Sequence, residues 1–539
     1  MKLSGVLSMA CCTFGFGMQA AVFHIDPASG SMQNDGSASA PWSTLAEVLD
    51  AELIATRSYS PLPYEAGVSQ LVPKNPGAPV QAGDTLLLFS GLHGDCFYRG
   101  AYNTAVITIM AADGETPVLS QFHMQACANW RLIGVQVSPE PYGVFHGEPL
   151  VRFASHGYHG PTRDVEVRDC NVSTAADTWE WTAAEWVDRA SDGIRVSGNH
   201  AAILNNELTN VHFGIVLAGD SGQAVGNSIV NFSGDGMRPM GSDILFEGNT
   251  IKNCYAVGDG NHDDGIQSFT NLANPFYRVT LRGNTIINNE DPDQPLMGAM
   301  QGIGLFDGPF IDWVVENNVV LVDHWHGISL YGAQDCRVVN NTVIDPSPDT
   351  GPGPSWIMIN DIDGFPSSGC VVANNIANTF NITDAVMSAN LSVSGADYAL
   401  HFVDATAHDV HLIAGSAAID AADDAYAPAT DRDGNPRPFG AQSDIGAYEH
   451  IGSTGITPVG DRSIAVFPNP ASTELTVTLP GSRGRAVLEV IASDGRLVKS
   501  VAVAGGPATI DIRGLAAGHY TWRVRDPGTV LGIGSFIKD

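Results

Sequence analysis

The fold is decided by the consecutive phrases AVGNSI (224–229), SGDGMR (233–238), FEGNTI (246–251) and HDDGIQ (262–267). One phrase carries an Asn near its end, and the other carries Asp-Gly before an apolar residue. Where the first phrase recurs, its Asn position falls at Val135, Cys170, Asn206, Asn227, Asn249, Asn284, Asn318, Asn341 and Asn375. These positions are 21 to 36 residues apart, which fits a base step of about 22 residues with insertions. Such a repeat is typical of a solenoid with loops on one side.

The second phrase recurs in step with the first, once in each repeat, so each coil has at least two strands in fixed register. Its apolar residue falls at Ile194, Ile215, Met237, Ile266, Ile303, Ile328 and Ile357. Because stacked strands lie about 4.8 Å apart, equivalent Asn side chains would form a structural ladder of amide hydrogen bonds. Over residues 22–410 the pattern resembles the right-handed parallel β-helix, the pectate-lyase-like fold of many bacterial carbohydrate-active proteins. The expected fold class is therefore all-β.

The N-terminal residues 1–21 combine a charged start, a short apolar run and small residues. This pattern is typical of a secretory signal peptide. The competing interpretation is a lipoprotein motif ending at Cys11, which leaves a shorter apolar run before the cysteine. No other apolar run reaches the roughly 20 residues that a membrane helix needs. We therefore expect an exported protein without a membrane span.

Both ends of the solenoid carry predicted closing segments. Residues 22–51 predict a strand, a turn region and an amphipathic helix capped at Ser43 or Thr44, which would cover an open strand edge. Residues 411–450 are rich in turns and resemble the closing segment of secreted β-helix proteins. A linker rich in Gly, Ser and Thr follows at 451–461.

Residues 462–539 are predicted to form a separate module. Alternating apolar residues between Asp-Gly, Gly and Pro turns predict a small β-sandwich. The motifs FPNPA (467–471), DGR (494–496), LAAGHY (515–520) and FIK (536–538) resemble the type 9 secretion sorting domain of Bacteroidota. The resemblance implies the type 9 secretion machinery as a partner, followed by release or attachment to the cell surface. The competing interpretation is a carbohydrate-binding sandwich.

Charge and cysteine content limit the partners. A formal net charge of −32 argues against binding nucleic acid or an anionic membrane. The negative charge also argues against a polyanionic glycan as substrate, unless divalent cations or a local Arg cluster make the electrostatic potential at the site positive. The cysteines show no zinc-site spacing. Cys336 and Cys370 each lie five residues before a ladder Asn, so they form either a disulfide across adjacent coils or a pair of buried thiols.

An insertion at 177–189 carries Trp179, Trp181 and Trp186 within eight residues. Flat aromatic faces suit sugar rings, so the insertion predicts one wall of a substrate site. The alternative is a short helix that packs its indoles on the side of the solenoid.

Three Asp-Gly phrases share one register, at Asp192, Asp235 and Asp264. Side chains alternate along a strand, so the residue that follows each inward apolar residue points outward, and these outward residues share one face. These outward side chains are Arg195, Arg238 and Gln267. Asp235 and Asp264 would lie about 5 Å apart on neighbouring coils, where two carboxylates must share a proton or a cation. Asp-Gly is also an ordinary turn dipeptide, so each phrase has a structural interpretation as well.

This cluster resembles the calcium site of β-helix pectate lyases, in which Asp-Gly on one coil and Asp-Asp-Gly-x-Asp on the next bind the ion. The implied ligands are Asp235, Asp263 and Asp264, with Gln267 in the fourth place. The catalytic base of that family is a lysine, and this chain has none between Lys252 and Lys499. Arg238 or a histidine would have to replace it.

A second resemblance, to polygalacturonase-like hydrolases, comes from the order Asp235, Asp263-Asp264 and His326-Gly327-Ile328-Ser329. An inverting hydrolase needs a protonated carboxyl and a base about 6.5–9.5 Å apart. His326 lies two coils beyond the Asp pair, whereas the distance in that family is one coil, and no Arg-Ile-Lys follows.

The sequence therefore predicts an exported protein that acts on an extracellular polysaccharide. We favour a calcium-assisted polysaccharide lyase, because the acidic spacing follows the lyase motif more closely. The alternatives are an inverting hydrolase and a non-catalytic glycan-binding or adhesin β-helix. The predicted catalytic residues are Arg238, Asp264 and His326. The predicted substrate-binding residues are Arg195, Trp179, Trp181, Trp186, His262 and Gln267.

Overall fold

The computed structural model divides the chain into two compact units, residues 1–450 and 451–539. In the first unit it describes residues 20–145, 147–347 and 351–450, and in the second it describes residues 451, 465–467, 471–479, 486–492, 496–503, 506–516, 518–526 and 529–538. Most of the predicted signal peptide and of the predicted linker lies outside these residues. Within the described residues, no helix is long and apolar enough to cross a membrane.

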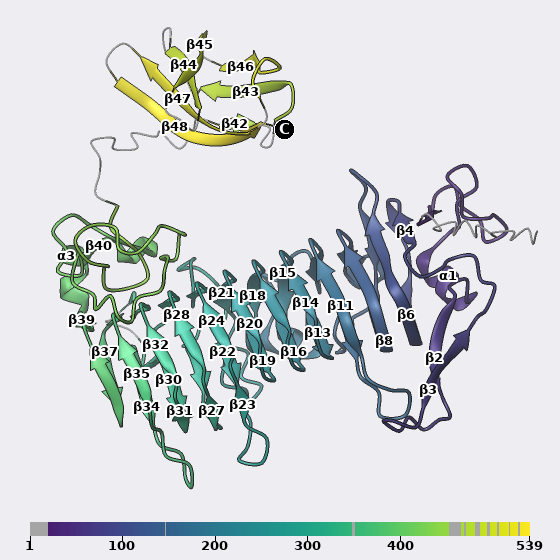
Figure 1. Ribbon diagram of the computed structural model, residues 1–539, viewed down its shortest axis with the longest axis horizontal. Helices are drawn as coiled ribbons and strands as arrows, with labels where there is room; N and C mark the ends of the chain where they lie inside the picture. The colour runs from purple at the N-terminus through teal and green to yellow at the C-terminus, as the bar shows by residue number, and fades with distance from the viewer. Residues whose placement is uncertain are drawn as a thin grey trace, which may run out of the picture. The chain divides into compact units, whose positions relative to one another are not determined.

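The first unit is the predicted right-handed parallel β-helix, built from three ladders of parallel strands (Figure 1). The first ladder contains β13 (Ile194–Ser197), β16 (Ile215–Ala218), β19 (Met237–Met240), β22 (Asp264–Ser268), β26 (Gln301–Leu305), β30 (His326–Tyr331) and β34 (Trp356–Asn360). The second contains β11 (Arg163–Arg168), β14 (Ala202–Leu204), β17 (Gln223–Val225), β20 (Leu245–Glu247), β24 (Thr280–Arg282), β28 (Val314–Glu316), β32 (Arg337–Val339) and β35 (Cys370–Ala373). The third contains β12 (Asn171–Ser173), β15 (Glu207–Val211), β18 (Ser228–Phe232), β21 (Thr250–Cys254), β25 (Thr285–Ile287), β29 (Val319–Leu321), β33 (Thr342–Ile344) and β36 (Ile376–Ala377).

The apolar residues of the second sequence phrase set the register of the first ladder. From Ile194 to Ile357, each of the seven predicted positions pairs with the next one. Their side chains are buried in one continuous core. The predicted strand register is therefore confirmed.

The predicted Asn ladder lies at the bend between the second and third ladders. From Asn227 onward, each rung accepts two hydrogen bonds through Oδ1, and Asn284, for example, accepts from the backbone N–H and Nδ2 of Asn249 at 3.1 and 2.9 Å. The Nδ2 of Asn284 donates to the Oδ1 of Asn318 at 3.0 Å. Asn390 adds a rung that the repeat did not predict. The ladder satisfies amides that would otherwise be buried without partners.

The N-terminal end is closed largely as expected. Strand β1 (Val22–Ile25) pairs with β4 (Thr85–Leu88), so the chain enters the ladder immediately. Helix α1 (Leu45–Asp50) has Thr44 as its N-cap and buries Leu45, Val48 and Leu49 against the first coils. An antiparallel hairpin of β2 (Thr56–Ser60) and β3 (Gln70–Lys74) is inserted here.

The segment after the last coil packs along the solenoid. Helix α3 (Tyr398–His401) and strands β40 (Phe402–Asp404) and β41 (Asp409–Leu412) precede a turn-rich stretch. In that stretch, Arg437 and Glu449 form a fully buried ion pair at 2.6 Å. The Arg437 guanidinium also donates to backbone carbonyls of the same stretch, which fixes its path.

The six cysteines between Cys96 and Cys370 are buried free thiols. Cys336 and Cys370 occupy paired places on adjacent coils, next to the pair Arg337 and Val371. Their Sγ atoms donate to different backbone carbonyls, those of Phe310 and Ala333. Of the two predicted states, the structure holds the buried thiols.

The second unit contains two antiparallel sheets. One is formed by β42 (Ala465–Phe467), β43 (Glu474–Leu479) and β46 (Gly506–Asp511). The other is formed by β44 (Ala486–Ala492), β45 (Leu497–Val503), β47 (Gly518–Asp526) and β48 (Thr529–Lys538). Leu475 and Ile510 of one sheet share a buried cluster with Leu488 and Trp522 of the other, as a β-sandwich requires.

Candidate functional site

A column of glycines shapes the loop end of the first ladder. In six consecutive coils a glycine precedes the inward anchor residue, at Gly193, Gly214, Gly236, Gly265, Gly302 and Gly327. A Cβ on Gly236 would lie 2.3 Å from Cγ2 of Ile251, and one on Gly265 would lie 2.5 Å from Cγ2 of Ile286. Only glycine therefore fits this bend. The residue before the glycine takes the same place on every coil, and these residues are Asp192, Phe213, Asp235, Asp264, Gln301 and His326.

Asp235 and Arg238 form a fixed ion pair at this edge. The Nε of Arg238 donates to Oδ2 of Asp235 at 2.5 Å, and the aspartate side chain is fully buried. Oδ1 of Asp235 accepts from Nδ2 of Asn261 at 3.0 Å and from the backbone N–H of Asp264 at 3.1 Å. The guanidinium lies 4.0 Å from the ring centroid of Phe213. Arg238 is thereby held in one position while part of its side chain stays accessible.

Asp264 and His262 form the second pair. Nδ1 of His262 lies 3.0 Å from Oδ2 of Asp264, and Nε2 of Gln267 donates to the same oxygen at 3.0 Å. Asp264 is fully buried, whereas the His262 side chain is 59% exposed. The hydrogen bond to Asp264 raises the pKa of His262, and burial raises the pKa of Asp264 to about 7. The two groups therefore share a proton near neutral pH.

Asp263 lies behind this pair. Burial raises the pKa of Asp263 to about 7, and its hydrogen bonds with Asn261 and Cys254 oppose that shift. Nδ2 of Asn261 lies 3.4 Å from Oδ1 of Asp263. Asn261 thus contacts both Asp235 and Asp263, and it links the two acidic positions.

These groups surround a pocket of about 320 Å³, which we call the central pocket. Its lining residues are Arg238, Asn261, His262, Gln267, Ser268, Phe269, Phe306 and Asp307. The structure thus brings together the predicted residues Arg238, His262 and Gln267, with Asp235 and Asp264 buried beneath them. A cation, an imidazole and two aromatic faces line one small cavity.

His326 lies beyond Phe306 and does not line the central pocket. The ring of Phe306 separates the two histidines, with centroid distances of 5.8 Å to His262 and 5.0 Å to His326. Nδ1 of His326 lies 2.8 Å from Oγ of Ser329. Burial lowers the pKa of His326 to about 4, so it is neutral at pH 7. The predicted catalytic grouping of His326 with Asp264 is therefore not a direct contact.

The tryptophan insertion supports the site instead of forming its wall. Helix α2 (Ala183–Arg189) is capped by Thr182, and Trp186 is buried. The Trp186 ring packs 4.7 Å from that of Tyr255, which begins the loop to His262, and Trp181 packs edge-on against Trp186. The prediction that Trp186 binds substrate is wrong, because its ring is covered. Trp179 is exposed but does not line the central pocket.

Arg195 shares the outward column of Arg238 but lies two strands away. Val216 of β16 stands between them. The Arg195 side chain is exposed, and its Nη1 lies 3.8 Å from Asp192. Its predicted role in substrate binding therefore finds no support in the central pocket.

Calcium requires several converging oxygens. The oxygens of Asp235 face Arg238, Asn261 and a backbone N–H, and Oδ2 of Asp264 faces His262 and Gln267. In the part of the chain that the structure describes, no three His, Cys, Asp or Glu side chains are placed to hold a metal ion. The residues present do not fit calcium, because Arg238 is already paired with Asp235, and His262 and Gln267 already occupy Oδ2 of Asp264. Calcium at Asp235, Asp263 and Asp264 stays a prediction that this arrangement does not support.

Three residues of the site were not predicted. Asn261 connects the two acids, Phe306 separates the two histidines, and Phe213 supports Arg238. The repeat could have identified Phe213, because on its own coil Phe213 takes the place of the Asp in the Asp-Gly phrase. Asn261 and Phe306 lie outside the repeat phrases, so the period gave no information about them.

Comparison with known families agrees with the two units. Residues 192–381 match the family model described as right handed beta helix region, and residues 465–532 match the secretion system C-terminal sorting domain. The sorting domain implies export by type 9 secretion to the cell surface or the extracellular space. No curated protein matches the chain.

Several solved structures are similar in fold. Pectate lyase Pel9A is 15% identical over 80% of this chain and 97% of that chain, with a TM-score of 0.44. A rhamnogalacturonan lyase is 14% identical over 70% and 90%, with a TM-score of 0.40. The A-module of the Azotobacter vinelandii mannuronan C-5 epimerase AlgE6 is 12% identical over 57% and 91%, with a TM-score of 0.37.

Proposed function

We propose that this right-handed parallel β-helix protein, exported through its type 9 sorting domain, is a polysaccharide lyase that cleaves a uronate-containing glycan. The observation that carries the proposal is the pairing of an accessible imidazole with an accessible guanidinium in the central pocket. Elimination next to a uronate needs a base for the C5 proton and a positive charge for the carboxylate. His262 and Arg238 are groups of these two kinds.

His262 is the proposed base. Nδ1 of His262 faces the buried Asp264 at 3.0 Å, and no described residue hydrogen-bonds its Nε2. A carboxylate behind an imidazole fixes the orientation of the ring and stabilises the imidazolium that forms on proton uptake. Because Asp264 raises the pKa of His262, the free base prevails only at a higher pH than for an ordinary imidazole. Activity should accordingly rise with pH as the His262–Asp264 pair loses its proton.

Arg238 is the proposed partner of the uronate carboxylate. Asp235 and Phe213 hold the guanidinium in place, so little side-chain freedom is lost when the substrate binds. The same charge stabilises the negative charge that develops as the C5 proton leaves. Calcium has no part in this proposal.

The step balances without a further reagent. His262 takes the C5 proton, and the electron pair of the C5–H bond forms the C4–C5 double bond. The C4–O bond breaks, and its electrons leave with the glycosidic oxygen. That oxygen gains a proton, which the imidazolium can return, and the products are an unsaturated uronate and a new chain end.

An inverting hydrolase is the second candidate, supported by one observation. Burial raises the pKa of Asp263 to about 7, so its carboxyl is partly protonated near neutral pH, as a general acid must be. Asp263 does not line the central pocket, however, so this candidate is second.

The test is a panel of pectin, alginate, ulvan and neutral glycans, followed by ultraviolet absorbance and by reducing ends. A lyase produces both signals on a uronate glycan. We expect His262→Gln and Arg238→Ala each to lower kcat/KM by about 10²-fold or more. Arg195→Ala is the matched control, since it removes an exposed arginine of the same column outside the pocket.

Reducing ends without ultraviolet absorbance would replace elimination with hydrolysis. Loss of activity in the Arg195 variant equal to that in the Arg238 variant would move the site away from the central pocket. Silence on every glycan would favour a non-catalytic binding protein.

A further inference from the structure

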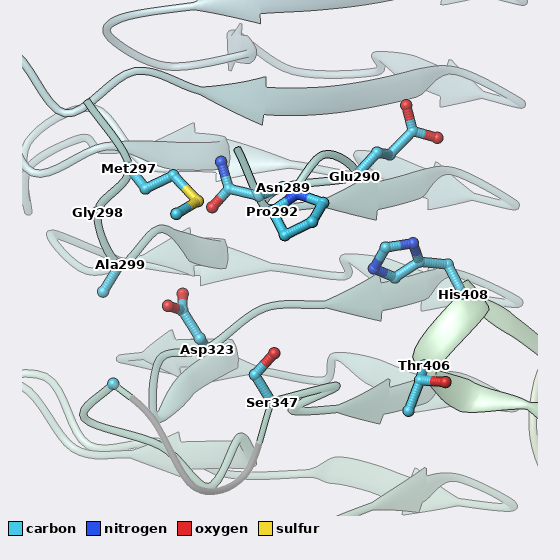
Figure 2. Close-up of a pocket in the computed structure, with 11 residues that line it drawn as sticks. Asn289, Glu290, Pro292, Met297, Gly298, Ala299, Asp323, Ser347, Thr406 and His408 are labelled. Carbon is cyan, nitrogen blue, oxygen red and sulfur yellow. The ribbon is translucent and has the colours of Figure 1, made fainter. Parts of the chain in front are cut away.

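A larger cavity, of about 610 Å³, lies between loops of the later coils and the segment that follows the last coil. We call it the distal cavity. Its lining residues are Asn289, Glu290, Pro292, Met297, Gly298, Ala299, Asp323, Ser347, Gly351, Thr406 and His408. Figure 2 shows Asp323 directed into this space from one side and His408 reaching over it from the other. Its volume is in the range of small-molecule sites.

Asp323 is the fixed acceptor of the distal cavity. Nδ2 of Asn288 donates to its Oδ1 at 2.5 Å, and the backbone N–H of Met300 also donates to its carboxylate. The side chain forms no ion pair with any described residue. A carboxylate held by neutral donors retains acceptor positions for further hydroxyl groups.

The charges around the distal cavity disfavour an anion. Neither lysine nor arginine occurs among the lining residues. Glu290 pairs with Lys252 at 2.7 Å, so that lysine is already neutralised. Asp345, fully buried nearby, adds a second carboxyl whose pKa burial raises to about 6. A uronate here would meet like charges without a counter-ion.

The other lining groups suit a polyol. Asn289 lines the cavity, and its Nδ2 is a buried donor without a hydrogen-bond partner among the described residues, so a small rotation of the side chain would bring it to a hydroxyl group. Burial lowers the pKa of His408, which leaves a neutral imidazole that both donates and accepts at pH 7. Met297 and Pro292 supply apolar surface for C–H groups. Donors, acceptors and an apolar face together match a sugar ring that carries several hydroxyls.

We propose that the distal cavity binds a neutral, hydroxyl-rich sugar residue, with Asp323 accepting from its hydroxyl groups. This site differs in chemistry from the central pocket, where Arg238 favours an anionic sugar. The proposal does not depend on the lyase reaction, because it concerns binding alone.

The test is saturation-transfer NMR on the full chain with three matched pairs: galactose and galacturonate, glucose and glucuronate, mannose and mannuronate. In the Arg238→Ala chain, whose central pocket has lost its cation, we expect transfer to at least one neutral sugar and weaker transfer to its uronate partner. Asp323→Asn should weaken the binding of the neutral sugar about tenfold or more. Ala299→Phe, which fills the cavity from its exposed rim, should abolish it.

Arg238→Ala is the control, because it alters only the central pocket and should leave this signal unchanged. Absence of transfer to all three neutral sugars would overturn the proposal. Stronger transfer to the uronates in the Arg238→Ala chain, or a neutral-sugar signal that survives both distal substitutions, would do the same. Loss of the signal in Arg238→Ala alone would place the binding in the central pocket and also overturn it.

Discussion

At the scale of single residues, the recurring Asp-Gly phrase combines two independent requirements. The glycine is imposed by packing, since a Cβ on Gly265 would also lie 3.0 Å from the carbonyl oxygen of Gly302 on the next coil. The residue before it is under no such constraint, because Phe213, Gln301 and His326 occupy the same place on other coils. The repeated glycine is therefore a requirement of the fold, whereas the residue before it can vary and supplies the side chains of the site.

The partly buried Asp263 predicts a specific pH dependence of stability. The pKa of Asp263 is about 7 in the folded chain, whereas its reference pKa is 3.8. At a pH between these two values, the folded chain keeps a proton on this carboxyl that the unfolded chain has lost. Stability must then fall as pH rises from about 4 to 7. Asp263→Asn removes this loss, and we expect it to raise the free energy of unfolding at pH 8 by about 1–3 kcal/mol, with little effect near pH 4. Chemical unfolding at both pH values checks this.

Asp307→Asn serves as the comparison, because Asp307 is an exposed carboxylate of the same region. Its stability should follow that of the parent at both pH values. Equal effects of the two substitutions at pH 8 would show that burial of Asp263 is not the cause.

At the scale of structural elements, the sequence determines strands better than loops. The 22-residue period fixed the register of the first ladder and the Asn rungs, because every coil repeats the same contacts. The loops repeat nothing, so the packing of Trp186 on Tyr255 and the bridge by Asn261 could not be deduced from the period. The register predicts the acidic cluster because Asp235 and Asp264 hold the same place before the inward residue of neighbouring strands. It does not predict the contact of His262 with Asp264, because His262 lies in the loop before β22.

The Asn ladder predicts a graded cost of removing a rung. Asn284→Ala would leave two buried N–H donors of Asn249 without their acceptor and would remove one of the two donors to Oδ1 of Asn318. We expect a loss of about 2–4 kcal/mol in the free energy of unfolding. Asn390→Ala, at the partly exposed last rung, should cost about 1 kcal/mol, because water can replace it. Denaturant unfolding followed by tryptophan fluorescence measures both, and equal losses would contradict a ladder whose interior rungs matter most.

At the scale of the whole molecule, the chain separates the export signal from the β-helix, to which we assign the proposed glycan site. The sorting module has its own core, in which Leu475, Leu488 and Trp522 are buried without help from the β-helix. Residues 1–450 likewise enclose their own continuous core. Each unit therefore has the apolar interior that separate folding requires.

This division predicts that export can be removed without loss of the β-helix. A chain that ends at residue 450 should accumulate inside the cell envelope while it keeps the unfolding midpoint of the β-helix. A reporter protein fused to residues 451–539 should leave the cell. Cell fractionation and immunoblotting distinguish these outcomes, and undiminished export of the truncated chain would contradict a sorting role for the module.

The acidic surface gives a final prediction about the substrate. A net charge of −32 repels a polyuronate over distances comparable to the Debye length, which is about 30 Å at 0.01 M salt and about 8 Å at 0.15 M. The attraction by Arg238 acts only within the pocket, where salt screens less. Added salt should therefore lower KM for a polyuronate over this range and leave kcat unchanged, whereas a methyl-esterified glycan should show no trend. Steady-state kinetics on the two glycans tests this prediction. A KM that rises with salt would contradict it, because such a rise requires long-range attraction between the chain and the polyuronate.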